Sequence, residues 1–94
     1  MKGCVKQIMK KITMFTMQSC PYCQRARKWM SEVLESDANY KKIPLTIIDE
    51  VEEPDIAEKF DYYYVPTYYL DDKKVHEGVA TFEIVKKVFD GALD

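Results

Sequence analysis

The stretch TMQSCPYCQRARKWM, residues 16–30, decides how the rest of the chain is interpreted. It holds Cys20 and Cys23, with only two residues between them. The apolar, partly β-branched run ITMFTM at residues 12–17 predicts a short buried strand before the pair. From Pro21 onward, apolar residues recur at intervals of three and four, which predicts a helix with one buried face. The pair is therefore expected where a strand ends and a helix begins, as a disulfide staple, a metal clip or a reactive dithiol.

Beyond this helix, the chain continues with another strand pattern and another helix pattern. IPLTIID, residues 43–49, predicts a second buried strand. Acidic residues around Pro54 predict the start of a short helix, because the helix dipole favours negative charge there and proline lacks the N–H that would stay unpaired. The residues expected to face inward from these two helices are Ala26, Trp29, Met30, Val33 and Leu34 in the first, and Ile56, Ala57 and Phe60 in the second.

The last third of the sequence predicts a hairpin and a final helix. YYYVPTYYLDD, residues 62–72, predicts a strand that Pro66 interrupts, with a turn at 71–74 and a returning strand at 74–78. Thr81 is expected to cap the final helix. Its inward residues are expected to be Phe82, Val85, Val88, Phe89 and Leu93.

This order of elements predicts the fold class. Strand, helix, strand, helix, strand, strand, helix implies an α/β protein with a four-stranded mixed sheet and helices on both faces. A chain of 94 residues is expected to form one domain, 1–94. A net charge of −2 predicts no nucleic-acid surface, and no apolar run has the length of a membrane span or signal peptide. We therefore expect a monomeric cytoplasmic protein without nucleic-acid or membrane partners.

The position of each cysteine predicts its role. Three cysteines are an odd number, which is untypical of a disulfide framework, and a close pair in a reducing compartment is more often catalytic or metal-binding. Cys20 is expected near the helix N-cap with Pro21 as the first helical residue, so backbone N–H groups and the helix dipole favour its thiolate. Cys23, one turn further, is expected to be more buried and less ionised. Arg25, Arg27 and Lys28 add positive charge nearby, but they are expected to be exposed, so solvent and salt screen them. We interpret Cys20 as the nucleophile and Cys23 as the resolving thiol.

With CPYC at this junction, the sequence resembles the glutaredoxin and thioredoxin superfamily, and specifically the dithiol glutaredoxins. The resemblance covers nearly the whole chain through the redox motif, the element order and the pair Val65-Pro66 at the third strand. It implies a thioredoxin-like fold and a cis peptide bond before Pro66, across from Cys20. It also implies that the backbone of Val65 pairs with substrate as an added strand. Flanking this site, Pro21, Tyr22 and Tyr64 are the candidates for lining a substrate groove.

Several positions differ from the patterns of the two branches. Glutaredoxins usually have Lys or Arg three residues before the first cysteine, where this chain has Met17. They also commonly have a Gly-Gly pair followed by Ser or Thr and then Asp. Here Gly78 and Thr81 match that pattern as candidate contacts for glutathione, while Phe82 fills the acidic position. Thioredoxins usually have Trp before the first cysteine, Gly-Pro between the pair, and a buried acid in the preceding strand. This chain has Ser19, Pro-Tyr and Met14 at those positions.

The resemblance implies a thiol-disulfide oxidoreductase that reduces protein or mixed disulfides and holds no bound cofactor and no metal. The CPYC motif favours the glutaredoxin branch, in which the electron donor is glutathione, and the alternative is a thioredoxin-like reductant that receives electrons from a flavin-dependent reductase. The alternative from a different class is a noncatalytic metal or iron-sulfur carrier. Adding Cys4 and His76 to the pair gives a nominal zinc set, although neither has the spacing of paired ligands. We interpret Cys4 as an incidental thiol or a regulatory one, and His76 as a surface residue of the returning strand.

Overall fold

The computed structural model describes residues 9–93, which form a mixed sheet and helices on both of its faces. The sheet has the strand order β3-β2-β4-β5, in which β2 runs parallel to β3 and antiparallel to β4, and β4 runs antiparallel to β5. The elements are β2 (Ile12–Thr16), α1 (Pro21–Ser36), the 3₁₀ helix η1 (Ala38–Lys42), β3 (Leu45–Asp49), α2 (Pro54–Ala57), β4 (Thr67–Leu70), β5 (Lys73–Glu77) and α3 (Phe82–Leu93).

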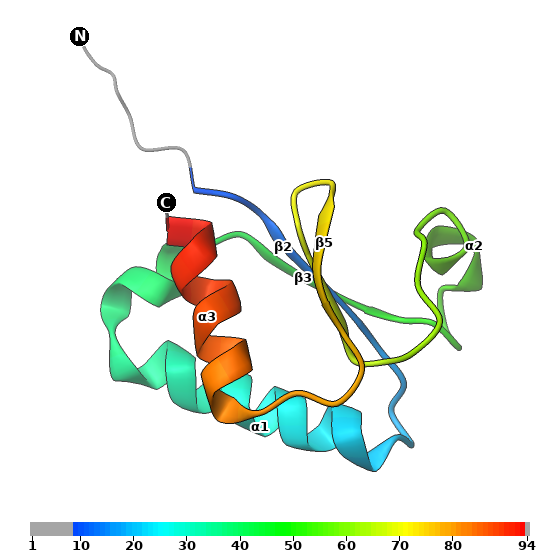
Figure 1. Cartoon of the computed structure of the whole chain (residues 1–94), viewed down its shortest axis with the longest axis horizontal. Coiled ribbons are helices and arrows are strands. Elements are labelled where there is room, and N and C mark those ends of the chain that lie inside the picture. Colours follow the sequence, from blue (N-terminus) through cyan, green and yellow to red (C-terminus); the bar gives the residue numbers. More distant parts are fainter. Residues whose placement is uncertain (1–8, 94) are drawn as a thin grey trace, which may run out of the picture.

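The central strand β2 explains how the two faces are built. All five of its residues are buried, because the sheet is covered on both sides. Successive side chains of a strand point to opposite faces. Ile12 and Met14 therefore point toward α1 and α3, while Phe15 points toward α2. Figure 1 shows α1 and α3 packed against each other, with α2 well apart from them.

Two hydrophobic clusters hold these layers together. The larger lies between the sheet and the helices α1 and α3, and the smaller lies on the opposite face beside α2. Trp29 and Phe82 connect α1 with α3 through an edge-to-face contact with 6.3 Å between ring centroids. The buried members of the larger cluster are Ile12, Met14, Ala26, Met30, Val33, Tyr40, Ile43, Tyr68, Val85, Val88, Phe89 and Ala92, and those of the smaller are Phe15, Ile48, Ala57 and Tyr69. The α/β architecture with a four-stranded mixed sheet, predicted from the element order, is confirmed, and so is the thioredoxin-like fold that the resemblance implied.

Some expected details were wrong. The second strand starts at Leu45, because Ile43 ends η1, and Ile47 is 45% exposed. It pairs only with β2, so it is an edge strand and not a buried one. The helix α2 is a single turn in which Ile56 is exposed. Phe60 lies beyond that turn and is half-buried against the smaller cluster.

The strand expected across Pro66 exists only after it, since β4 begins at Thr67. The hairpin turn is shorter than expected, and β5 occupies 73–77 where 74–78 was predicted.

Within residues 9–93, none of the helices combines the length and apolar character that a membrane crossing requires.

Candidate active site

The two cysteines lie at the junction between β2 and α1, as predicted. Cys20 is the N-cap residue with an extended backbone, and Pro21 is the first residue of the helix. The N–H of Cys20 donates to the carbonyl of Met17 at 3.0 Å, and the N–H of Gln24 donates to the carbonyl of Cys20 at 3.0 Å. This turn fixes the direction of the Cys20 side chain. Both thiols are free.

Cys20 is half-exposed, and no side-chain cap bond occupies the N-terminus of α1. Partial burial raises the pKa of its thiol, but hydrogen bonds from the N–H and thiol of Cys23 and from the N–H of Tyr22 outweigh this effect, with help from the charge of Arg27. The net result is a pKa below the ordinary value for cysteine. A helix N-terminus with open N–H groups stabilises an anion, so Cys20 is the more readily ionised thiol of the pair.

Cys23 is in the opposite situation. It is fully buried on the inner face of α1. Burial raises the pKa of its thiol, and the nearby sulfur of Cys20 raises it further. The Thr16 side chain and the Met17 backbone lower this pKa in turn, without cancelling the effect of burial. One thiol of the pair is therefore prepared to react first, and the other is held protonated behind it.

Two residues beside Cys23 were missed by the sequence analysis. Thr16, the last residue of β2, is 3% exposed and was assigned only to the strand. Arg27 was interpreted as an exposed, screened charge, but it is half-buried, and its Nη1 donates to Thr16 Oγ1 at 2.9 Å. The spacing of Arg27 four residues after Cys23 was the available signal, because residues four apart share one face of a helix.

The segment around Pro66 lies at the same end of the sheet. Phe15 pairs with Thr67, so the next residues along the two strands bring Pro66 opposite Thr16. The Val65–Pro66 peptide bond is cis, as the resemblance implied. Among residues 9–93, neither the N–H nor the C=O of Val65 has an intramolecular hydrogen-bond partner. The backbone of Val65 is thus available to an external strand.

The loop before Pro66 is held by a carboxylate from β5. Glu77 accepts hydrogen bonds from the N–H groups of Tyr63 at 2.5 Å and Tyr64 at 2.9 Å, and Lys74 contacts the same carboxylate at 2.7 Å. The Lys74 ammonium and these backbone donors lower the pKa of Glu77 to about 2. Tyr64 is 70% exposed, so it is not a core residue and stays a candidate for substrate contact.

The other predicted groove residues are near the cysteine turn and the loop before α3. Tyr22 is exposed, and the Arg25 guanidinium lies 5.2 Å from the centroid of its ring. The Gly78 N–H donates to the carbonyl of Pro66 at 2.9 Å, so the structure brings these two residues together. Thr81 Oγ1 accepts from the Ile84 N–H at 3.2 Å, which confirms the predicted cap. The cap bond uses one acceptor site of the Thr81 hydroxyl.

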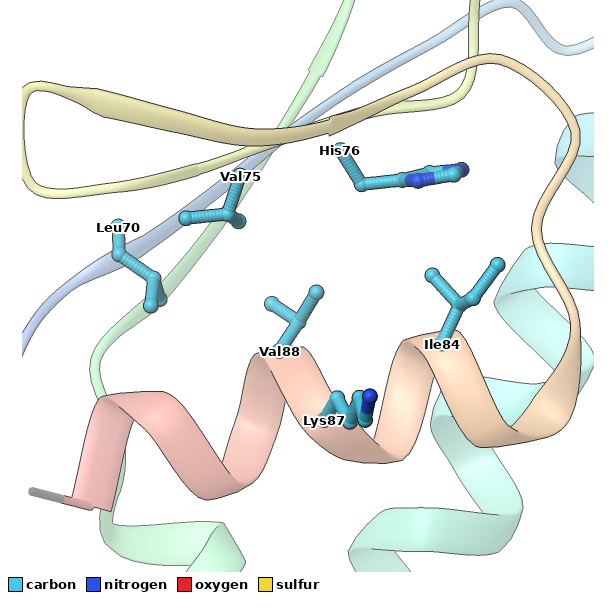
Figure 2. Close-up of a pocket in the computed structure, with 6 residues that line it drawn as sticks. All are labelled: Leu70, Val75, His76, Ile84, Lys87 and Val88. Carbon is cyan, nitrogen blue, oxygen red and sulfur yellow. The ribbon is translucent and has the colours of Figure 1, made fainter.

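His76 was wrongly interpreted as a surface residue. It is half-buried, and its Nε2 lies 3.2 Å from the carbonyl of Gly78 and 2.9 Å from that of Val79. Figure 2 shows it beside a cavity of about 220 Å³ between β5 and α3. The residues that line this cavity are Leu70, Val75, His76, Ile84, Lys87 and Val88. None of them belongs to the cysteine turn, so this cavity is separate from the candidate active site.

A second small cavity, of about 140 Å³, flanks the cysteine turn and is partly acidic. Met17 and Ser19 line it together with Asp49 and Glu52. Asp49 accepts hydrogen bonds from the Gln18 N–H at 3.1 Å and the Val51 N–H at 2.8 Å, which fixes its carboxylate there. The position where glutaredoxins usually carry a cation thus has a methionine with carboxylates beside it.

A protein that carries a metal ion needs several ligand side chains close together. Within residues 9–93, no three His, Cys, Asp or Glu side chains come together in a way that could hold a metal ion. Cys4, which completed the nominal zinc set and was also considered as a regulatory thiol, lies outside the described residues.

Three solved structures have folds similar to that of this chain. A thioredoxin-like protein from Clostridium perfringens, described as uncharacterized, is 26% identical with a TM-score of 0.67, over 93% of this chain and 73% of that one. The oxidised thioredoxin from Plasmodium falciparum is 21% identical with a TM-score of 0.68, over 88% of this chain and 80% of that one. A malarial protein is 16% identical with a TM-score of 0.69, over 92% of this chain and 99% of that one.

No curated protein matches the chain with significant similarity. The family model described as thioredoxin domain matches residues 10–90, which include both cysteines and the segment around Pro66. This match spans most of the chain. The protein therefore belongs to the thioredoxin domain family and is a thioredoxin-like thiol-disulfide protein whose C-x-x-C pair is Cys20 and Cys23.

Proposed function

We propose that this protein is an oxidoreductase that reduces disulfide bonds of other proteins by dithiol exchange. The Cys20 thiolate attacks one sulfur of the substrate disulfide, and the other substrate sulfur leaves as a thiolate. Cys23 then attacks Cys20, forms the intramolecular disulfide and releases the second substrate sulfur. Two electrons pass to the substrate, and an external reductant must return them.

The observation that supports this proposal is the difference between the two thiols. Cys20 is accessible, and its pKa is lowered by the hydrogen bonds at the start of α1, whereas Cys23 is buried with a raised pKa. A nucleophile needs a thiolate that substrate can reach. A resolving thiol needs only to reach Cys20, and burial protects it from reacting with other disulfides.

An extended substrate segment fits the surroundings of the pair. The free N–H and C=O of Val65, beside the cis peptide bond of Pro66, can pair with one residue of an added strand. Tyr22 and Tyr64 are exposed on the two flanking segments and offer apolar contacts. Pro21 stiffens the turn between the thiols. This arrangement favours a polypeptide over a small adduct.

Two classes of electron donor could reduce the Cys20–Cys23 disulfide, glutathione and a flavin-dependent thioredoxin reductase. The CPYC motif resembles glutaredoxins and favours glutathione. Met17 and the nearby Asp49 and Glu52 favour the other branch, because glutathione carries two carboxylates that would meet like charge here. Phe82 also fills the acidic position of the glutaredoxin pattern. We therefore propose a flavin-dependent thioredoxin reductase as the donor, and a cytoplasmic, monomeric protein.

The deciding experiment couples reduction of a protein disulfide, such as those of insulin, to NADPH oxidation. One assay contains thioredoxin reductase, and the other contains glutathione with glutathione reductase. We expect turnover in the first assay and only background in the second. Turnover with glutathione alone would assign the protein to the glutaredoxin branch instead.

Variants of the pair test the two roles. Cys20→Ser should abolish turnover, and Cys23→Ser should stop after one step with substrate covalently bound to Cys20, detectable by mass spectrometry. Retained turnover in Cys20→Ser, or the absence of a trapped adduct in Cys23→Ser, would contradict the proposed roles. A metal or iron-sulfur carrier would instead purify anaerobically with bound metal and no turnover.

A further inference from the structure

A buried polar pair lies directly behind the resolving cysteine. Ile12, Met14 and Thr16 alternate along β2 and share the face that packs against α1. This places the Thr16 hydroxyl between the sheet and the helix face that carries Cys23 and Arg27. Arg27 Nη1 donates to Thr16 Oγ1 at 2.9 Å. A hydroxyl that accepts on one side has its own hydrogen free to donate on the other.

We propose that Thr16, held by Arg27, donates a hydrogen bond to the sulfur of Cys23 and prepares it to attack the mixed disulfide. Arg27 is a positioning residue in this scheme, because it acts through Thr16. The inference rests on the proposed function and concerns its second step. Thioredoxins usually have a buried acid in this strand, but this chain has the apolar Met14 at that position. Thr16 is then the polar side chain that β2 offers to Cys23.

The groups around Cys23 explain why such a partner matters. Burial raises the pKa of the Cys23 thiol, and the sulfur of Cys20 raises it further, while the Thr16 side chain lowers it. Tyr68 is the other titratable group nearby, and its hydroxyl is buried without a hydrogen-bond partner among residues 9–93. Burial and the charge of Cys23 raise the pKa of Tyr68, so it stays protonated and cannot accept the proton. The positive charge of Arg27 acts in the opposite direction on this pKa.

The step balances without another reactant. Cys23 gives its thiol proton to water, and the resulting thiolate attacks the Cys20 sulfur. The Cys20–Cys23 bond forms as the bond between Cys20 and the substrate breaks, and the substrate sulfur leaves as a thiolate that takes up a proton. A donor aimed at the Cys23 sulfur stabilises its thiolate before attack.

The test follows the two steps separately with 5,5′-dithiobis(2-nitrobenzoic acid), in a Cys4→Ser background that removes the third thiol. The first nitrothiobenzoate is released when Cys20 attacks, and the second when Cys23 resolves the mixed disulfide. We expect Thr16→Val to slow the second release about tenfold near neutral pH and to move its pH midpoint upward by about one unit. The first release should keep its rate. Thr16→Ser should restore the second release.

Thr13→Val is the matched control, because Thr13 is a buried threonine of the same strand on the opposite face of the sheet. It should leave both releases unchanged. Arg27→Gln should slow the second release, and it provides the test if Thr16→Val fails to fold. An unchanged second release in both Thr16→Val and Arg27→Gln would overturn the inference, as would equal slowing by Thr13→Val. If the Cys4→Ser protein without further substitutions shows no first release, the proposed function itself is overturned.

Discussion

The helices α1 and α3 pack against each other but begin differently. At the start of α3, Thr81 caps the helix, with its Oγ1 accepting from the Ile84 N–H. At the start of α1, the cap position is Cys20, so no side-chain oxygen accepts a cap hydrogen bond from the helix N–H groups there. The first N–H groups of α1 act on a sulfur instead, and they lower its pKa.

This difference shows how the same backbone feature serves stability in one helix and reactivity in the other. A hydroxyl at the N-cap satisfies a helix donor permanently. A thiol is a weaker acceptor, so those donors gain most when the sulfur becomes an anion. Proline as the first residue of α1 removes one N–H that would otherwise stay unpaired. The start of α1 therefore favours the ionised form of Cys20 over a static cap.

The largest expected effect comes from making the two helix starts alike. Cys20→Ser places a hydroxyl at the N-cap of α1, as Thr81 does in α3. Reduction of protein disulfides should fall to background, while the free energy of unfolding should change by no more than about 1 kcal/mol, because serine is a favoured N-cap residue. Activity and urea unfolding measured on the same preparation test both parts. Residual turnover, or a protein that no longer folds, would contradict this account of α1.

A shift in pH dependence is the next effect in size. The rate of alkylation by iodoacetamide follows the thiolate fraction, so it rises through the pKa of each thiol. Since the pKa of Cys20 is lowered and that of Cys23 is raised, the midpoint for Cys20 should lie below that of a free cysteine, and the midpoint for Cys23 above it. Peptide mapping after timed alkylation assigns each rate. Coinciding midpoints for the two thiols would remove the asymmetry on which the mechanism depends.

The smallest effect should come from the capped helix. Thr81→Ala removes the hydroxyl that accepts from Ile84 and should lower the free energy of unfolding by about 1 kcal/mol. It should leave the alkylation rate of Cys20 unchanged, because that sulfur responds to α1. Thr81→Ser is the matched control and should keep the stability. A changed Cys20 rate in Thr81→Ala would mean that the two helix starts are coupled.

Local patterns in the sequence predicted the elements that carry the site. The apolar, partly β-branched run before Cys20 and the three- and four-residue spacing after Pro21 predicted the β2–α1 junction, and Thr81 was correctly predicted as a cap. Predictions failed where burial depends on distant neighbours. IPLTIID contains the apolar residues of a buried strand, but β3 is at the sheet edge, which only the strand order decides.

The same reason explains the misjudged polar residues. Arg27 was expected to be exposed because arginine usually is, yet it reaches Thr16 across the space between α1 and β2. His76 was assigned to the surface of an edge strand, but α3 covers that face and the following loop supplies two carbonyls to its ring. Contacts between residues far apart along the chain leave no periodic signal for a sequence pattern to reveal.

The sequence by itself determined the type of chemistry, because a C-x-x-C pair beginning a helix needs only local backbone geometry to make one thiol acidic. The tertiary structure decided what surrounds those sulfurs. It placed the cis Val65–Pro66 bond at the same end of the sheet, carboxylates beside Met17, and the Thr16–Arg27 pair behind Cys23. These neighbours come from different strands and helices, and only the pairing of β2 with β3 and β4 brings them to one end of the sheet.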